Sequence, residues 1–213
     1  MLEEIIEAAR QAGRIMLEAE KMSMDVKEKT GSANFVTQYD MAVQENLRRA
    51  LKKICPEADF LGEEGNDRPE QTELVFIVDP IDGTTNFIHG YRHSAISIAL
   101  AQNGKIEYGV VYNPYTEEGF SAARGRGAYR NGEPIHVSSR PMKEALICFG
   151  TSPYDPSLAE ASFRLAKRLF DMAADIRRSG SAALDLCAIA AGQGEFDFEL
   201  VLQPWDFAAS SLM

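Results

Sequence analysis

Cysteine and histidine are scarce in this chain of 213 residues, which contains three of each. Cys55, Cys148 and Cys187 lie far apart and form neither a CxxC pair nor the spacing of a zinc site. An odd number of separated cysteines favours free thiols in a reducing compartment, so we expect each to pack as a small apolar side chain. The sequence also has no Cys or His nucleophile motif, and we expect a cytoplasmic protein.

The sequence has no long apolar run and no surplus of basic residues. No apolar segment approaches the roughly 20 residues that a membrane-spanning helix needs, and the acidic residues 1–6 lack the features of a secretory signal. Lys and Arg number 22 against 32 Asp and Glu, for a formal net charge of −10. Because nucleic acids and anionic membranes attract clustered cations, we expect neither as a partner. A site for an anionic phosphate would need local positive charge, which metal ions could supply.

The pattern of apolar residues predicts a single α+β domain over residues 1–213. Helices and hairpins are mixed without a strict βαβ alternation, which favours a layered fold over a doubly wound parallel sheet. An apolar run at 74–78 predicts a strand buried on both faces, and Asn103-Gly104 predicts a hairpin between strands 94–100 and 106–112. The other expected segments are helices 2–21, 156–172 and 181–191, a helix ending before Pro56, β structure at 127–137, strands 145–149 and 196–202, and a polar loop at 27–34.

Two aspartates directly follow the buried strand, in the segment Asp79-Pro80-Ile81-Asp82-Gly83-Thr84-Thr85. An apolar strand cannot end in two carboxylates at low cost unless they are solvated, paired or bound to a metal. Pro80 fixes the chain direction, so that both carboxylates and the Ile81 carbonyl can point into one space. Oxygen ligands of this kind suit Mg²⁺ or Mn²⁺. Gly83-Thr84-Thr85 has the composition of a helix start, whose free amides suit a phosphate.

Three further acidic segments lie where an element begins or ends. They are Gly62-Glu63-Glu64-Gly65, Trp205-Asp206, and Asp40 after Val36-Thr37. Taken alone, the spacing of Asp79 and Asp82 is also typical of an Asp-capped turn with no bound metal. The metal hypothesis therefore depends on these segments meeting in the fold.

Together these motifs resemble the inositol monophosphatase family of metal-dependent phosphatases. The matching pieces occur in the family's order along the whole chain: Val36-Thr37 with Asp40, Gly62-Glu63-Glu64, Asp79-Pro80-Ile81-Asp82-Gly83-Thr84-Thr85-Asn86-Phe87, Gly180-Ser181-Ala182-Ala183 and Trp205-Asp206. The resemblance implies a layered αβαβα sandwich. Family members continue past the Trp-Asp motif, so it also implies that the C-terminal part of the family fold is absent from residues 1–213.

The resemblance implies two or three Mg²⁺ ions per active site, or Mn²⁺ in their place. Glu63, Asp79 and the Ile81 carbonyl would hold the first ion. Asp79, Asp82 and Asp206 would hold the second, with Asp79 bridging the two. A third, weaker site would involve Glu63, with Asp40 acting through water. Two ions that share the Asp79 carboxylate would clamp the attacking and leaving oxygens of an in-line displacement.

The resemblance also implies roles in catalysis and substrate binding. Glu63 and Thr84 would orient and activate a metal-bound water, and Asp40 would support them. The residues expected to bind phosphate or the substrate hydroxyls are Asp82, Gly83, Thr84, Ser181, Ala182 through its backbone, Glu199 and Asp206. For Glu199, a solvated strand residue is an equal alternative.

The expected reaction is Mg²⁺-dependent hydrolysis of a small phosphate monoester, most simply inositol 1-phosphate, to the alcohol and phosphate. The resemblance implies a lithium-sensitive enzyme and a homodimer. Within the same superfamily, fructose 1,6-bisphosphate, NADP, histidinol phosphate and 3′-phosphoadenosine nucleotides are alternative substrates. A non-catalytic binding or regulatory protein with the same fold is the alternative from another class.

Several neighbouring polar residues are expected to lie outside the chemistry. Glu64 should point away from Glu63, as an outer or solvated residue. His89 and His93 are expected to be structural or exposed, and His136 exposed. Solvated roles are also favoured for four basic residues that could otherwise approach the phosphate or influence substrate choice: Lys29, Arg124, Arg126 and Arg130.

Overall fold

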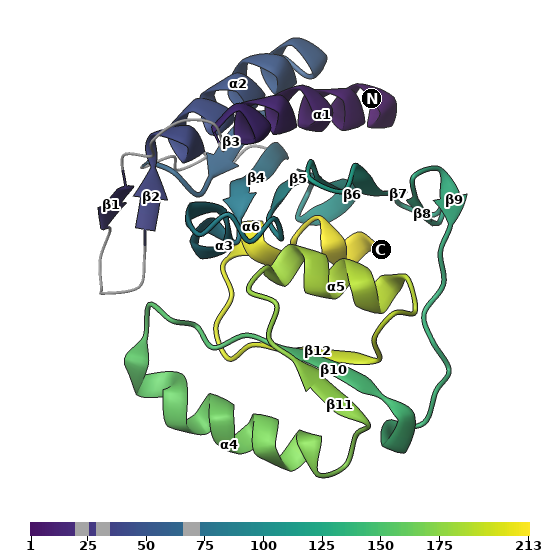
Figure 1. Cartoon of the computed structure of the whole chain (residues 1–213). Helices are drawn as coiled ribbons and strands as arrows, with labels where there is room; N and C mark the ends of the chain where they lie inside the picture. The colour runs from purple at the N-terminus through teal and green to yellow at the C-terminus, as the bar shows by residue number, and fades with distance from the viewer. Residues whose placement is uncertain (20–25, 29–34, 66–72) are drawn as a thin grey trace.

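The computed structural model describes residues 1–19, 26–28, 35–65 and 73–213. Its helices are α1 (Leu2–Ala19), α2 (Gln38–Ile54), α3 (Thr84–Ile88), α4 (Ala159–Phe170), α5 (Ala182–Ala190) and α6 (Pro204–Phe207), with 3₁₀ turns η1 (Met142–Glu144), η2 (Pro156–Leu158) and η3 (Ser210–Leu212). In Figure 1, α1 and α2 cover one face of a seven-stranded sheet, α5 and α6 lie between it and a three-stranded sheet, and α4 covers the far side. This order confirms the expected layered αβαβα fold.

The seven-stranded sheet has the strand order β3-β4-β5-β6-β7-β8-β9. Its strands are β3 (Asp59–Gly62), β4 (Leu74–Asp82), β5 (Ala95–Gln102), β6 (Lys105–Asn113), β7 (Glu118–Ala123), β8 (Ala128–Arg130) and β9 (Glu133–Pro134). β3 is parallel to β4, and all later neighbours are antiparallel. Asn103 and Gly104 have φ of 50° and 73°, as a two-residue hairpin turn requires, which confirms the predicted hairpin. β7 is a strand that the apolar pattern does not predict.

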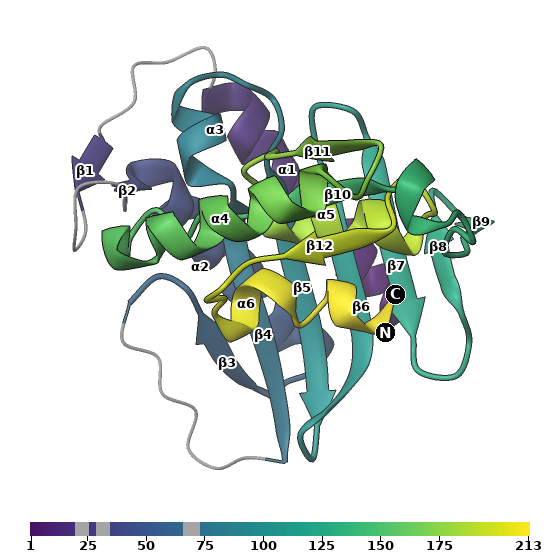
Figure 2. The same cartoon turned by 90° about the horizontal axis from the view of Figure 1, so that it is seen from below.

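Two apolar cores lie on opposite faces of this sheet. The larger core packs α1 and α2 onto the sheet and buries Ile5, Leu47 and Phe76, in agreement with the predicted amphipathic helices. The smaller core packs α5 and the C-terminal residues onto the other face. Gly109 of β6 allows η3 to lie against the strand (Figure 2), because a Cβ there would come within 2.3 Å of the Ala209 carbonyl oxygen.

The three-stranded sheet is parallel, with β10 (Leu146–Phe149) between β11 (Asp175–Arg177) and β12 (Phe196–Phe198). The sequence does not predict β11, which is only three residues long. β12 ends at Phe198, before the predicted end at residue 202, because Glu199 turns to bind another loop. The predicted helix 156–172 is divided into η2 and α4.

The predicted loop at 27–34 is partly wrong. Residues 27 and 28 belong to β1 (Val26–Glu28), which pairs with β2 (Phe35–Thr37) in an antiparallel arrangement. The remainder of that segment, including Lys29, lies outside the described residues. All three cysteines are free and buried, as expected. Within the described part of the chain, no helix has both the length and the apolar character needed to cross a membrane.

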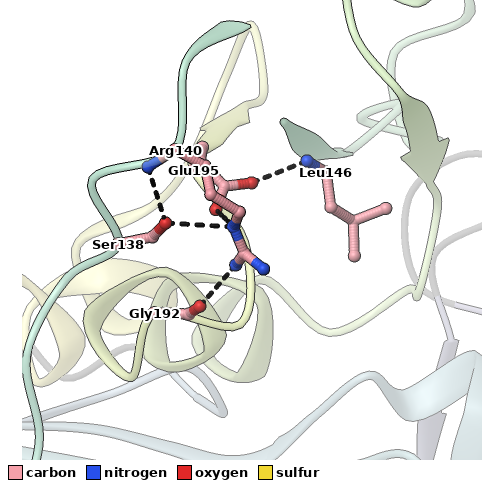
Figure 3. Close-up of polar contacts among 5 residues, drawn as sticks. All are labelled: Ser138, Arg140, Leu146, Gly192 and Glu195. Carbon is pink, nitrogen blue, oxygen red and sulfur yellow. Dashed lines mark hydrogen bonds and ion pairs between the residues drawn. The ribbon is translucent and has the colours of Figure 1, made fainter. Parts of the chain in front are cut away.

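Arg140 ties the connection between the two sheets to the loop that follows α5 (Figure 3). Its Nε donates to Glu195 Oε1 at 2.6 Å and to Ser138 Oγ at 3.1 Å, and its Nη2 donates to the Gly192 carbonyl at 2.6 Å. The other Glu195 oxygen accepts from the Leu146 amide at 2.6 Å. A single carboxylate therefore fixes the start of β10, the start of β12 and the connecting segment.

We expect Glu195→Gln to lower the free energy of unfolding by about 1 kcal/mol, because it removes the negative charge that pairs with Arg140. The effect stays this small because the Arg140 side chain is half exposed and solvent screens the pair. Although burial alone would raise the pKa of Glu195, the Leu146 amide, Ser138 and Arg140 lower it. The stabilisation should therefore be complete at neutral pH and disappear as the pH falls through this lowered pKa. Urea unfolding at several pH values measures it.

The matched control is Glu144→Gln, because within the described ranges Glu144 pairs only with the adjacent Lys143 at 3.9 Å, and both side chains are largely exposed. It should change stability by less than about 0.5 kcal/mol. Equal effects of the two substitutions would show that the Arg140 contact does not stabilise the fold.

Candidate active site

Asp79 and Asp82 lie at the end of β4, where its pairing with β5 is irregular. The ladder passes from Asp79 opposite Ser97 to Asp82 opposite Ala95, so β4 carries an extra residue, as in a bulge. Both carboxylates are buried, with 2% and 7% exposure, and both line one cavity of about 140 Å³. The Ile81 amide donates to Asp79 Oδ1 at 3.0 Å. Burial is the main cause that raises the pKa of both carboxyls well above the usual range.

The N-terminus of α5 binds Asp82 directly. Ser181 Oγ donates to Asp82 Oδ2, and the Ala183 amide donates to the same oxygen at 3.1 Å. Ser181 is also the N-cap of α5, since its Oγ accepts from the Leu184 amide at 3.4 Å. Ala182 lies between these residues on the cavity wall. The fold thus joins Asp82 to the predicted substrate-binding residues Ser181 and Ala182.

Glu63 and Asp206 reach the same cavity from two other elements. Glu63 directly follows β3, and Asp206 lies in α6, where its Oδ2 accepts from the Gln203 amide at 2.6 Å. After burial, the negative charges of Glu63, Asp82 and Asp206 contribute to the raised pKa of Asp79. Burial also raises the pKa of Asp206 to about 7. The four carboxylates that were predicted as metal ligands therefore lie around one cavity.

Asp40 is fully buried beside Thr84. As the third residue of α2 it forms a capping box with Thr37, whose amide donates to Asp40 Oδ2 at 2.8 Å. The Thr84 hydroxyl lies 3.3 Å from Asp40 Oδ1 and 3.1 Å from the Ile81 carbonyl. Asp40 is thus placed to orient Thr84.

Gly83 lies between β4 and α3, and Thr84 is the first residue of α3. Gly83 is the N-cap of α3 and has a left-handed φ of 84°, which a side chain would disfavour. A Cβ there would also lie 3.0 Å from the Gly180 carbonyl oxygen. The predicted helix start is confirmed, but α3 is only five residues long. Thr84 and Gly83 both line the cavity.

Glu199 lies on the opposite wall of the cavity and is not a solvated strand residue. Its Oε1 accepts from the Ser152 amide at 2.7 Å and from Ser152 Oγ at 3.1 Å. Its other oxygen packs on Gly150, where a Cβ would come within 1.9 Å of it. Glu199 is therefore held by the loop after β10, with its carboxylate in the cavity.

The chemistry of these residues fits a hard divalent cation. Their donors are all oxygens, and among the described residues no basic side chain forms an ion pair with Asp79, Asp82 or Asp206. Burying carboxylates in this way is costly unless a cation compensates them. No three Asp, Glu, His or Cys side chains in the described regions already form a complete ligand set.

Three charged residues of the cavity were missed by the sequence prediction: Arg178, Asp185 and Asp197. Burial is the main cause that raises the pKa of Asp185 to about 6 and that of Asp197 to about 7. Asp185 follows the predicted Gly180–Ala183 motif on α5, and its place in the first turns of that helix was the available signal. Arg178 and Asp197 had none, because β11 was not predicted and β12 was not placed beside β10.

The remaining candidates lie outside the cavity, in agreement with prediction for most of them. Arg124 and Arg130 pair with Glu107 at 3.1 Å and Glu118 at 3.5 Å, and Arg126 is exposed, so none of the three can set substrate choice directly. His89 and His136 are exposed and His93 is half-buried. Glu64 is buried rather than solvated, and the Gln44 side chain bonds both its amide and its carbonyl.

Comparison with known proteins points to one family. The sequence model of the inositol monophosphatase family matches residues 1–213. The chain is 36% identical over 220 residues to Nus factor SuhB of Pseudomonas aeruginosa and 39% identical over 219 residues to Nus factor SuhB of Vibrio cholerae. Both matches cover 100% of this chain and 81% of the relative. Because these relatives are named as Nus factors, the expected absence of a nucleic-acid partner is not supported.

Solved structures show the same fold. The extragenic suppressor protein SuhB of Bartonella henselae matches with a TM-score of 0.90 at 38% identity, over 99% of this chain and 82% of that one. The Thermotoga maritima IMPase matches with a TM-score of 0.87 at 32% identity, over 97% and 78%. The match of the family model, the identities over the whole chain and the shared fold agree with the carboxylate cavity, and this chain belongs to the inositol monophosphatase family.

Proposed function

We propose that this protein hydrolyses a small phosphate monoester in the presence of Mg²⁺, most simply inositol 1-phosphate, to the free alcohol and phosphate. The observation that carries this proposal is the meeting of Glu63, Asp79, Asp82 and Asp206 around one cavity beside Thr84. Family membership supports it. A non-catalytic role is not favoured, because a binding protein would gain nothing from four buried or half-buried acidic side chains that repel one another.

The residues proposed to hold the ions are Glu63, Asp79, Asp82, Asp206 and the carbonyl of Ile81. Bound Mg²⁺, or Mn²⁺, would neutralise charge on the phosphate oxygens and lower the pKa of a water molecule. Asp79 would be held in common by the two ions, and the charges of Glu63, Asp82 and Asp206 all contribute to its raised pKa.

Thr84 is proposed to orient the attacking water, with Glu63 as its acid–base partner. The Thr84 hydroxyl has one proton and two acceptors, Asp40 Oδ1 and the Ile81 carbonyl. Donating to either leaves its lone pairs free to accept a hydrogen bond from water. Asp40 does not move, because Thr37 binds its other oxygen, so it acts as a positioning residue for Thr84. Attack of water on phosphorus then breaks the bond to the alkoxide, which takes up a proton.

The alcohol part of the substrate is proposed to lie between the two sheets. Asp82, Ser181, the Ala182 backbone and Glu199 line this region, and Gly83 and Thr84 lie on the phosphate side. Fructose 1,6-bisphosphate, NADP and nucleotide 3′-phosphates remain alternatives to inositol 1-phosphate. We also propose a homodimer, on the basis of the resemblance, and a cytoplasmic location, with which three free buried thiols agree.

Asp79→Asn should stabilise the metal-free protein by about 1 kcal/mol, because it removes a buried negative charge while keeping the oxygen that accepts from the Ile81 amide. Added Mg²⁺ should raise the unfolding temperature of the wild type much more than that of the variant. Thermal unfolding with and without Mg²⁺ measures both effects. The control is Asp171→Asn, an exposed aspartate paired with Lys167, which should keep the wild-type Mg²⁺ response. An equal response in Asp79→Asn would contradict the assignment.

Asp82→Asn should reduce kcat at least about 100-fold, because it removes a metal charge but keeps an acceptor for Ser181 and Ala183. Phosphate release from inositol 1-phosphate and the alternative esters, with and without Mg²⁺, measures this. Circular dichroism should show an unchanged fold. Retention of most activity would rule out the two-metal assignment, and no phosphate release by the folded wild type from any ester would rule out the phosphatase.

Lithium should inhibit the wild-type enzyme if the second metal site forms as proposed, by occupying the position between Asp79, Asp82 and Asp206. Initial rates at fixed Mg²⁺ and increasing LiCl measure this, with NaCl as the control for ionic strength. Complete insensitivity to lithium would argue against a second site at these residues.

A further inference from the structure

Arg178 is the one basic side chain among the described residues that line the active-site cavity. Seven of the lining residues are acidic: Glu63, Asp79, Asp82, Asp185, Asp197, Glu199 and Asp206. The proposed metal ions account for four of these, Glu63, Asp79, Asp82 and Asp206. Arg178 is not part of that group and has no role in the reaction described above.

The side chain of Arg178 is exposed, and one hydrogen bond joins it to the loop after β10. Its Nη2 donates to Thr151 Oγ1 at 3.1 Å. Its Nη1 lies close to Gly180, where a Cβ would come within 2.7 Å of it. Thr151 adjoins Ser152, which binds Glu199. Arg178 is therefore on the wall proposed to face the alcohol part of the substrate, rather than on the β4 side.

The donors of Arg178 are not used in an ion pair. Within the described residues, no carboxylate lies at ion-pair distance from it, whereas its neighbour Arg177 pairs with Asp175 at 2.5 Å. A guanidinium has five N–H donors in a planar fork, and the bond to Thr151 uses one of them. The remaining donors of a guanidinium favour a bidentate contact with a carboxylate or phosphate.

The neighbouring carboxylates on this wall are bound by protein donors. Ser179 Oγ donates to Asp185 Oδ2 at 2.7 Å, and Ser152 binds Glu199 through two hydrogen bonds. Neither group forms an ion pair with Arg178, although the charge of Arg178 partly offsets the rise that burial causes in the pKa of Asp185. An anionic ligand group beside Arg178 would therefore meet a cation that has no ion-pair partner among the described residues.

We propose that Arg178 binds a second anionic group on the substrate, so that the preferred substrates are phosphate monoesters whose alcohol part also carries a carboxylate or a second phosphate. This inference rests on the proposed function. The metal-binding carboxylates account only for the reacting phosphate, whereas Arg178 would distinguish one alcohol part of the substrate from another.

The test compares esters that differ only in one carboxylate. In the first pair, 2-phosphoglycerate carries a carboxylate where glycerol 2-phosphate has a hydroxymethyl group. In the second pair, 6-phosphogluconate carries a carboxylate where sorbitol 6-phosphate has a hydroxymethyl group, and this carboxylate lies farther from the phosphate. The wild type should show a higher kcat/KM for the carboxylate in at least one pair. Arg178→Gln should lower kcat/KM for the carboxylate-bearing ester by roughly 10- to 100-fold, mainly by raising KM. For the ester without the carboxylate, kcat/KM should change less than about threefold.

Two further variants separate charge, geometry and structure. Arg178→Lys keeps the charge without the planar fork and should retain part of the preference. Arg177→Gln is the matched control, because Arg177 is adjacent, exposed and paired with Asp175, and does not line this cavity. It should leave the preference unchanged.

A wild type without any preference, or an equal loss on both members of each pair in Arg178→Gln, would overturn the proposal. If the wild type hydrolyses none of the esters, calorimetric binding of the same four compounds decides. A preference for the carboxylate that depends on Arg178 would support the anion site while the proposed function fails, and its absence would overturn both.

Discussion

The hydrogen bonds that Ser181 and the Ala183 amide donate to Asp82 are the contact on which the candidate active site depends. Asp82 ends β4 of the large sheet, and Ser181 begins α5, the helix between the two sheets. The same short region therefore caps a helix, compensates a buried carboxylate and fixes one sheet relative to the other. Arg140 and Glu195 fix the far end of α5, so that neither end of this helix can move alone.

The second constraint is the repulsion among the acidic residues that Asp82 joins. Asp79 and Asp82 are buried, and each has a raised pKa to which neighbouring carboxylates contribute. A fold that was selected for stability alone would not place these charges together. The elements that carry the acidic residues of this region are each held by contacts of their own. The sheet holds β4, the capping box holds the start of α2 with Asp40, and the contact of Asp206 with Gln203 holds α6. This arrangement keeps the acidic groups close, as the proposed metal site requires.

The sequence predicted the reaction centre better than the surrounding wall. The apolar run 74–78 and the turn after it place Asp79, Asp82 and Thr84 by local rules, and motif resemblance adds Glu63, Asp206 and Asp40. The layered fold and the Asn103-Gly104 hairpin were also predictable, because they follow from periodicity and turn chemistry. Arg178 and Asp197 were not predictable, since their positions depend on β11 and β12, three-residue strands whose pairing is set by the tertiary fold. The metal ligands, catalytic roles and substrate contacts stay predictions.

The two walls of the cavity come from different sheets, and in the proposed complex this would separate the reaction from the choice of substrate. β3 and β4 of the large sheet lead to Glu63, Asp79 and Thr84, which are proposed to face the phosphate. The residues that face the alcohol, Glu199 and Arg178, follow strands of the small sheet and bind the loop after β10. That loop can change its side chains without disturbing the end of β4. Substrate preference in this chain should therefore depend on Thr151, Ser152 and Arg178, while the rate of hydrolysis depends on the large sheet.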